Sequence, residues 1–302
     1  MWGKIGAIIR AVMAMILDGK ALSARIREKI KTRVATLPSQ PGLAVVLVGD
    51  DPASHTYVNL KQKACEETGI RFEKFLYSAG VSESEIIEKI NELNAREDIH
   101  GILVQLPLPN QDANNIIPEI NPLKDVDGFH RENIERLKRG EPAIASAVAL
   151  GVMKLIAHAI DQLPKEERKA VMVSSPLFAE PIETLMKERS IPMTVVQAES
   201  ENLKETTRDA DILIVAEGMP GLITGDMVKP DAIVIDVGTT RIDGKLRGDV
   251  DQLSVEPVAG ALTPVPGGVG PMTVAMLLVN ILKAYGFQMS KTLDIPRASA
   301  AS

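Results

Sequence analysis

Hydrophobic and polar positions alternate along the chain in a pattern that predicts alternating strands and helices. Short, continuous apolar runs are typical of buried parallel strands, and apolar residues at every third or fourth position are typical of the helices that cover them. In the first part of the chain, the predicted strands cover residues 43–48, 71–77 and 99–105, and the predicted helices cover residues 20–36, 53–68 and a segment that Ser82 and Glu85 open as a capping box. This β-α-β-α-β order indicates a parallel sheet with right-handed crossovers.

The same alternation returns in the second part of the chain. Between the two parts, residues 107–128 are rich in proline and are expected to form loops. The elements expected after them are a bridging helix near 145–160, strands at 169–174, 192–197, 211–216 and 232–237, a helix at 178–189 and an apolar helix from about 272 to 285. The pattern therefore predicts the α/β fold class with two successive units.

Composition narrows the class of protein. A chain of 302 residues, 45% of them hydrophobic and 25% charged, is long enough for two soluble domains. The net charge of −6 argues against a nucleic-acid-binding surface, and the single cysteine, Cys65, fits a reducing cytoplasm. We interpret the apolar residues 1–14 as an extension ahead of the first domain, a targeting segment being the alternative. Elsewhere no apolar run reaches the roughly 18 residues that a membrane span needs, so no membrane partner is expected.

Candidate chemistry begins with Tyr57 and Lys61, which lie on one face of the predicted helix because they are four residues apart. An ammonium group lowers the pKa of a nearby phenol, and burial lowers the pKa of a lysine toward the range in which it exchanges protons. An isolated Tyr-x-x-x-Lys spacing is more often an exposed helical turn. The surrounding sequence therefore decides between the two interpretations.

Polar residues near the ends of neighbouring strands supply partners for this pair. Ligands of open parallel sheets bind beyond the carboxyl ends of the strands, where Gln105, Asp125 and Asp127 are expected. Gln105 is suited to hold a lysine amine, and Asp127 is suited to accept two adjacent N–H bonds from a heterocyclic ligand. The alternatives are backbone contacts for Gln105 and Asx turns for the two aspartates.

A loop that reads P-V-P-G-G-V-G-P-M-T precedes the last predicted helix. Its glycines allow the backbone to approach a flat ligand closely, and its prolines make it rigid. Pro271 suits the first turn of the helix that follows. We therefore expect this loop to contact a ligand.

Four motifs together carry a resemblance to a known family. Y-V-N-L-K, V-Q-L-P-L-P, K-D-V-D-G and P-V-P-G-G-V-G-P-M-T-V-A-M-L stand in the order and spacing of the methylenetetrahydrofolate dehydrogenase/methenyltetrahydrofolate cyclohydrolase family, over roughly residues 15–287. The resemblance implies an N-terminal three-layer α/β folate domain (15–143) and a Rossmann-like dinucleotide-type domain (144–270). It also implies a C-terminal helix (271–290) that returns to the first domain, with a flexible tail (291–302) after it.

The same resemblance implies roles for individual residues. Lys61 is the catalytic lysine, Gln105 is its partner, Tyr57 is the residue beside the reacting carbon, and Asp127 is the anchor of the pterin. The residues expected to bind substrate from the glycine-rich loop are Pro266, Gly267, Gly268, Gly270 and Pro271, and those at cofactor-binding positions are Val173, Ser174, Ser175 and Thr239. No metal site is expected.

The second domain departs from the family pattern at the cofactor site. The phosphate loop of the family reads G-R-S-x-x-V-G-x-P, whereas residues 173–181 read V-S-S-P-L-F-A-E-P, without the two glycines and the arginine. An added Cβ crowds the turn where a pyrophosphate lies, and loss of the arginine removes a contact for a 2′-phosphate. In addition, Glu199 and Glu201 stand where basic or neutral groups are expected, and residues 146–149 read S-A-V-A in place of P-C-T-P.

The resemblance implies one-carbon folate chemistry. We expect a cytoplasmic homodimer that hydrolyses 5,10-methenyltetrahydrofolate to 10-formyltetrahydrofolate, whereas oxidation of 5,10-methylenetetrahydrofolate by NADP or NAD depends on the altered cofactor site. A non-catalytic folate-binding or partner subunit of the same fold is the alternative. A short-chain dehydrogenase would need a glycine-rich nucleotide loop ahead of Tyr57, and the sequence has none there.

Overall fold

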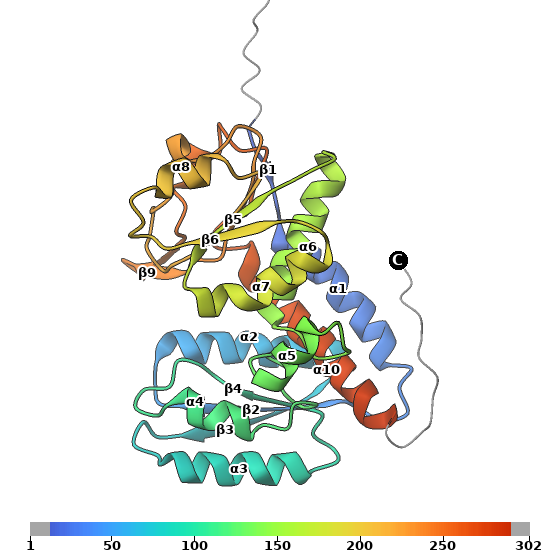
Figure 1. Cartoon of the computed structure of the whole chain (residues 1–302). Helices are drawn as coiled ribbons and strands as arrows, with labels where there is room; N and C mark the ends of the chain where they lie inside the picture. Colours follow the sequence, from blue (N-terminus) through green and yellow to red (C-terminus); the bar gives the residue numbers. More distant parts are fainter. Residues whose placement is uncertain (1–12, 291–302) are drawn as a thin grey trace, which may run out of the picture. The chain divides into compact units, whose positions relative to one another are not determined.

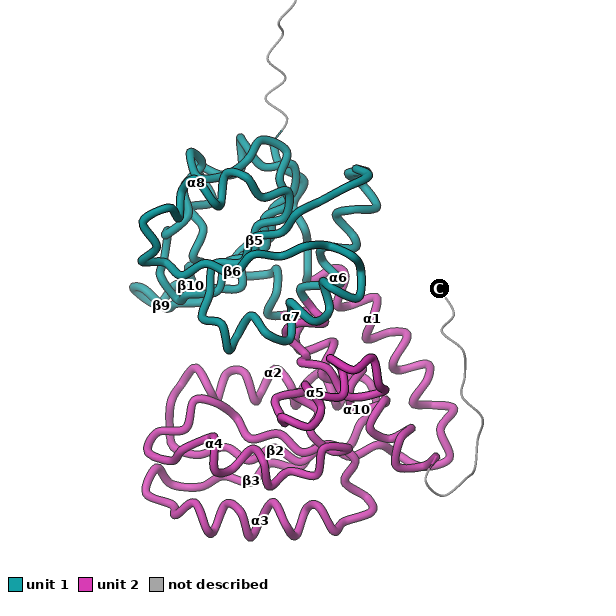
Figure 2. Tube along the Cα trace, viewed as in Figure 1, with its two compact units in different colours: residues 1–19, 152–270 teal, residues 20–151, 271–302 magenta. Residues whose placement is uncertain are grey.

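The structure, a computed structural model, describes residues 13–290, and this part of the chain divides into two compact units (Figure 1; Figure 2). Within it, unit 1 comprises residues 13–19 and 152–270, and unit 2 comprises residues 20–151 and 271–290. Most of the expected N-terminal extension and all of the expected C-terminal tail lie outside the described residues.

Unit 2 is built around a three-stranded parallel sheet in the order β3-β2-β4. Its elements are α1 (Gly19–Val34), β2 (Gly42–Val48), α2 (Pro52–Thr68), β3 (Arg71–Tyr77), α3 (Glu83–Ala95), β4 (Gly101–Val104), α4 (Ala113–Ile116), η1 (Ile117–Glu119), α5 (Arg131–Lys138) and the greater part of α10 (Val269–Ser290). Figure 1 shows α2 and α3 on opposite faces of this sheet, which gives the three layers that the resemblance implies.

The core of unit 2 follows from the apolar pattern of its strands and of α3. β2 and β4 are buried along their whole length, as their continuous apolar runs predict. Ile86, Ile90 and Leu93 recur at helical spacing on α3 and are buried in one cluster with side chains of β2 and β4. Each such aliphatic side chain stabilises the unit by roughly 1.5–3 kcal/mol.

Unit 1 contains a six-stranded sheet in the order β1-β11-β8-β7-β5-β6, in which every strand pair is parallel. The elements of unit 1, in chain order, are β1 (Met15–Ile16), most of α6 (Ala147–Gln162), β5 (Ala170–Ser174), α7 (Pro176–Glu188), β6 (Met193–Val196), α8 (Leu203–Arg208), β7 (Ile212–Ala216), η2 (Gly225–Met227), β8 (Ile233–Asp236), β9 (Thr240–Ile242), β10 (Lys245–Arg247), α9 (Gln252–Val255) and β11 (Ala261–Leu262). The alternation of parallel strands and helices is Rossmann-like, as expected.

The domain boundaries differ from those that the sequence indicates. Residues from 15 onward were assigned to the first domain, but β1 pairs with β11 and therefore belongs to unit 1. A strand of two residues is too short to carry a periodic signal, so the pattern did not reveal it. The second boundary falls inside α6, after Gly151, rather than at residue 143.

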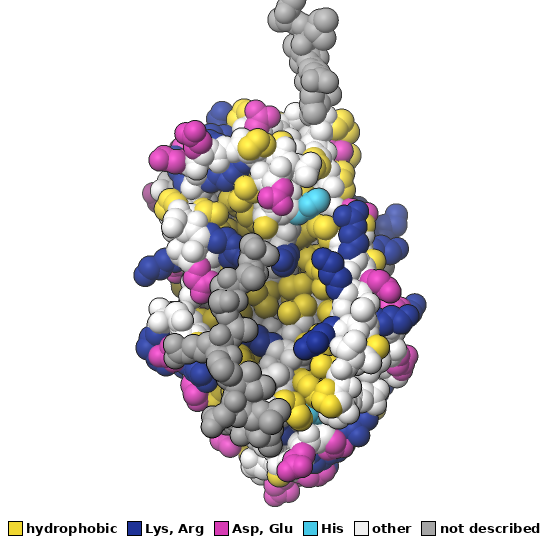
Figure 3. Space-filling view, turned by 90° about the vertical axis from the view of Figure 1, so that its right-hand side faces the viewer, with side chains coloured by type: hydrophobic (Ala, Val, Ile, Leu, Met, Phe, Trp, Pro, Cys, Tyr) yellow, Lys and Arg dark blue, Asp and Glu magenta, His cyan; other side chains and the backbone are white. Residues whose placement is uncertain are grey.

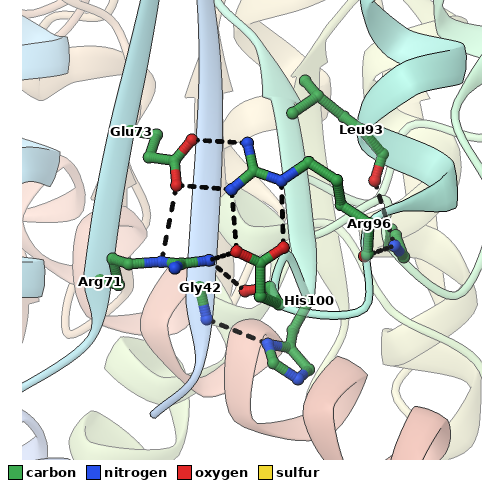
Figure 4. Close-up of polar contacts among 8 residues, drawn as sticks. Gly42, Arg71, Glu73, Leu93, Arg96 and His100 are labelled. Carbon is green, nitrogen blue, oxygen red and sulfur yellow. Dashed lines mark hydrogen bonds and ion pairs between the residues drawn. The ribbon is translucent and has the colours of Figure 1, made fainter.

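Charged residues at the amino ends of the unit 2 strands form a structural network (Figure 4). The guanidinium of Arg96 donates two hydrogen bonds to the carboxylate of Glu73, at 2.8 and 2.7 Å, and holds the pKa of Asp98 well below its usual range. His100 is buried, and its Nδ1 accepts a hydrogen bond from the N–H of Gly42 (3.0 Å). Burial lowers the pKa of His100 to about 4. These contacts connect the amino ends of β2, β3 and β4, at the end of the sheet opposite the carboxyl ends of the strands.

The last helix, α10, returns to unit 2 as the resemblance implies. Its side chains donate hydrogen bonds to backbone carbonyls of that unit: Asn280 to Val126, Lys283 to Ala143 and Gln288 to His100. By length and composition alone α10 is the one helix among residues 13–290 that can cross a membrane, but 61% of its most apolar window is buried in the protein. This burial is typical of a core helix.

Acidic and basic side chains both occur on the face of the molecule shown in Figure 3.

Candidate active site

Lys61 lies on α2, a helix that its own sequence defines at both ends. The Asp51 carboxylate accepts hydrogen bonds from the N–H and the hydroxyl of Ser54, both at 2.8 Å, and Pro52 occupies the first turn. The helix ends at Gly69, whose φ of 78° favours glycine. Between these ends, the side chain of Lys61 points inward and is only 7% exposed.

The structure brings Lys61 and Gln105 into direct contact. Lys61 Nζ donates a hydrogen bond to Gln105 Oε1 (2.9 Å), and Gln105 Nε2 donates to the carbonyl of Leu106 (2.7 Å), which fixes the orientation of the amide. Burial lowers the pKa of Lys61 below its ordinary value of 10.5, and the negative charge of Asp127 opposes this shift. Because the amide partner is neutral, the amine can both accept and release a proton.

The two aspartates of K-D-V-D-G have different surroundings. Asp125 is 1% exposed, and its carboxylate accepts hydrogen bonds from the N–H groups of Gly128 (3.0 Å) and His130 (2.8 Å). Asp125 therefore forms the turn, and burial raises its pKa to about 6. The carboxylate of Asp127 is partly buried and has no hydrogen-bond partner within residues 13–290. Burial raises the pKa of Asp127, while the charge of Lys61 lowers it, so its carboxylate is available to a ligand.

Two residues that the sequence did not single out hold this segment beside β4. The backbone N–H of Ile102 donates to the carbonyl of Lys124 (2.7 Å), and the buried Lys124 ammonium donates to three carbonyls at the C-terminal end of α3. From α10, the buried amide of Asn280 donates to the carbonyls of Val126 (2.9 Å) and Ala145 (2.8 Å). An asparagine within the apolar stretch M-L-L-V-N-I-L of α10 was the signal that could have revealed the second contact.

Tyr57 lies one helical turn before Lys61 on α2 and is half-buried. The spacing of four residues places the two side chains on the same face of the helix. Its role beside a reacting carbon stays a prediction.

The glycine-rich loop contains residues with different packing. The N–H of Gly268 donates to the carbonyl of Pro264 (2.8 Å), and a Cβ on Gly268 would lie 2.7 Å from that oxygen, so packing alone requires glycine here. Pro266 is exposed, and Gly267 has a φ of 114°. Gly270 and Pro271 lie in the first turn of α10, at the boundary between the two units. Substrate contacts from this loop also stay a prediction.

The expected cofactor residues lie at carboxyl ends of unit 1 strands. Val173 and Ala179 are fully buried, and Val173 belongs to the hydrophobic core. Both side chains are therefore buried within unit 1, and crowding of a pyrophosphate by their Cβ atoms stays a prediction. Ser174 is also buried and donates a hydrogen bond to the carbonyl of Ser175 (2.8 Å), whereas Thr239 is exposed just before β9.

The start of α7 retains part of a phosphate-binding turn. Ser175 caps the helix, and its hydroxyl accepts a hydrogen bond from the N–H of Phe178 (3.4 Å). Pro176 has no N–H, so Leu177 carries the remaining N–H of the first turn. A helix N-terminus of this kind fits a diphosphate, but Ser174 supplies no cation for a further phosphate.

Comparison with known proteins shows one family over most of the chain. Residues 17–127 match the model of the tetrahydrofolate dehydrogenase/cyclohydrolase catalytic domain, and residues 146–289 match that of the tetrahydrofolate dehydrogenase/cyclohydrolase NAD(P)-binding domain. The bifunctional protein FolD of Bordetella avium is 49% identical over 277 residues, which cover 90% of this chain and 97% of the relative.

Solved structures show the same similarity. The bifunctional FolD enzyme of Campylobacter jejuni superposes with a TM-score of 0.86 at 42% identity and covers 91% of this chain and 99% of its own. The methylenetetrahydrofolate dehydrogenase-cyclohydrolase of Trypanosoma brucei, solved with NADP and an inhibitor, has a TM-score of 0.85 at 33% identity, over 92% of this chain and 99% of its own. This chain belongs to the tetrahydrofolate dehydrogenase/cyclohydrolase family.

Proposed function

We propose that this protein interconverts one-carbon derivatives of tetrahydrofolate, with hydrolysis of 5,10-methenyltetrahydrofolate to 10-formyltetrahydrofolate as the reaction of the Lys61 site. The observation that carries the proposal is the hydrogen bond of 2.9 Å between the buried Lys61 ammonium and the neutral oxygen of Gln105. Membership of the family supports the same substrate class.

The reaction needs a group that moves protons, and Lys61 has the properties for it. Water adds to the methenyl carbon, the bond from this carbon to N5 breaks, and the formyl group stays on N10. A neutral Lys61 accepts a proton as water adds, the resulting ammonium donates one to N5, and the net proton goes to solvent. Burial lowers the pKa of Lys61 below its ordinary value of 10.5, which makes the neutral amine easier to form than in an exposed lysine.

Gln105, Tyr57 and Asp127 position the reactants in this proposal. The oriented amide of Gln105 keeps the amine in place without an ion pair. Tyr57, one turn from Lys61, lies beside the folate, and the unpaired carboxylate of Asp127 accepts the N–H groups of the pterin. Backbone contacts from Pro266, Gly267, Gly268, Gly270 and Pro271 to the folate are implied by the family resemblance alone and stay a prediction.

Oxidation of 5,10-methylenetetrahydrofolate is the second activity that the family supports, with NAD(P) as the hydride acceptor. The N-terminal turn of α7 would hold the diphosphate of the dinucleotide through the Leu177 N–H and the Ser175 cap. Thr239, exposed beyond β8, stands at a further cofactor position. A non-catalytic folate-binding subunit is disfavoured because the Lys61–Gln105 contact is intact.

We expect the protein to act in the cytoplasm as a homodimer. The buried, unpaired thiol of Cys65 fits a reducing compartment, and β6 is an edge strand of the unit 1 sheet, where a second copy of the chain could pair. Light scattering of the purified chain tests the dimer.

The direct test of function follows the absorbance of 5,10-methenyltetrahydrofolate as the purified chain is added without nucleotide. The proposal predicts a loss of absorbance well above the uncatalysed rate, with 10-formyltetrahydrofolate as product. A rate equal to that of buffer alone, with folate binding intact, would support the non-catalytic alternative.

A further inference from the structure

We propose that unit 1 selects a dinucleotide whose adenosine ribose carries a free 2′-hydroxyl and discriminates against a 2′-phosphate, with Glu199 as the selecting residue. The inference rests on the proposed function, because it concerns the cofactor of the oxidation step. Hydrolysis at Lys61 needs no dinucleotide, so the two proposals can fail separately.

The position of Glu199 follows from the order of the strands. In Rossmann-type sheets the diphosphate lies at the helix after the first strand, and an acidic side chain near the end of the second strand binds the ribose 2′-hydroxyl. Here β5 is followed by α7, and β6 pairs with β5 in parallel register, Val173 opposite Val196. Glu199 comes shortly after Val196 and is exposed. It therefore follows the carboxyl end of β6, the strand that neighbours β5 in the sheet.

Neighbouring carboxylates add to the negative charge of this edge. Glu217 directly follows β7, which flanks β5 on the other side. Burial raises the pKa of Glu217, and the negative charge of Glu199 raises it further. Asp249 is fully buried, and its Oδ2 accepts hydrogen bonds from the N–H groups of Glu217 (2.7 Å) and Gly218 (2.9 Å). A phosphate dianion would meet like charge here, whereas a ribose hydroxyl can donate to Glu199.

Three positions in unit 1 were candidates to neutralise a 2′-phosphate, and none of them places an unpaired cation at this end of the sheet. Ser174, at the arginine position of the family pattern, is buried and uncharged. Lys204, at the start of α8, forms an ion pair with Asp226. Arg208 lies in the last turn of α8, which leads into the amino end of β7 and so faces the opposite edge of the sheet. The charge pattern thus favours a hydroxyl over a phosphate.

Calorimetric titration of the full chain with NAD and with NADP tests the inference by a readout independent of turnover. We expect NAD to bind more tightly than NADP. Glu199→Gln removes a charge-assisted hydrogen bond and a repulsive charge, so it should reduce the NAD-over-NADP ratio of affinities by about tenfold or more. Adding Ser174→Arg to this variant should move the ratio further toward NADP.

Glu188→Gln is the matched control. It makes the same change of charge at an exposed position near the C-terminal end of α7, at the other edge of the sheet, and should leave the ratio unchanged. Thermal midpoints of all variants check that each one is folded. Binding of NADP as tight as that of NAD, binding of neither dinucleotide, or an unchanged ratio in folded Glu199→Gln would each overturn the inference.

The nucleotide-free hydrolysis assay separates this inference from the proposed function. Hydrolysis without any preference for NAD overturns the selection by Glu199 but leaves the folate chemistry standing. A clear preference for NAD without hydrolysis supports the selection by Glu199 and overturns the proposed hydrolysis at Lys61.

Discussion

Replacing Asp127 by asparagine removes one charge from the site at nearly constant volume. Its carboxylate has no hydrogen-bond partner within residues 13–290, so the protein itself loses no hydrogen bond. In the proposed complex it accepts pterin N–H groups, and a hydrogen bond to a charged group contributes roughly 1.5–3 kcal/mol. Asp127→Asn should therefore weaken binding of a folate analogue about 10- to 150-fold.

The same substitution should change the titration of Lys61. Burial lowers the pKa of Lys61, and the charge of Asp127 partly offsets that effect. Without this charge the ammonium is less stable, so the pKa of Lys61 falls further. The limb of the cyclohydrolase pH–rate profile that reports deprotonation of Lys61 should therefore move to lower pH in the variant.

Stability supplies the third readout. The folded-state pKa of Asp127 is raised above 3.8 because burial disfavours the carboxylate, so at neutral pH the native state bears a cost that asparagine removes. The thermal midpoint of Asp127→Asn should be equal to that of wild type or higher. Unchanged affinity with a large loss of stability would refute the reasoning and make Asp127 a turn residue like Asp125.

Three further predictions concern the framework of unit 2. Asp125→Ala leaves buried N–H groups without an acceptor and should lower the free energy of unfolding by at least about 2 kcal/mol, measured by chemical denaturation; a neutral effect would contradict its role in the turn. Asn280→Ala removes two hydrogen bonds to backbone carbonyls and should lower the free energy of unfolding by roughly 1–3 kcal/mol, with a smaller loss of folate affinity than in Asp127→Asn. An unchanged free energy of unfolding and an unchanged affinity would show that α10 does not hold the segment around Val126. The pKa of His100 is about 4 in the folded state against 6.5 unfolded. The contribution of the neutral imidazole to the free energy of unfolding is therefore complete above pH 6.5 and is lost as pH falls toward 4. Wild type should therefore lose about 3 kcal/mol more than His100→Gln over this range, and parallel stability curves would exclude the effect.

The sequence predicted most of this fold because the buried strands are continuous apolar runs. β2 (Gly42–Val48), for instance, is buried along its whole length and begins one residue before the predicted strand 43–48, and the capping box of Ser82 and Glu85 opens α3. Strands β1 and β11 escaped notice because two residues carry no periodicity. They form through pairing with residues far along the chain, which a local pattern does not contain.

The contact between Lys61 and Gln105 was predictable because it depends on residue type and on the place of Gln105 at the end of a strand. The catalytic roles of Tyr57, Lys61 and Gln105 rest on the family resemblance and stay predictions. Residue type and spacing left a turn role open for both Asp125 and Asp127, because that role depends on which carboxylate meets the N–H groups of the turn.

The most direct test of the central claim compares cyclohydrolase turnover of Lys61→Met and Lys63→Met with that of wild type. Lys63 lies on the same helix but is exposed, so Lys63→Met repeats the chemical change away from the site. A positioned acid–base group contributes roughly 10²–10⁴-fold, so Lys61→Met should lose about that factor while Lys63→Met keeps wild-type turnover. A folded Lys61→Met protein that turns over within about threefold of wild type would contradict the claim that Lys61 moves the proton.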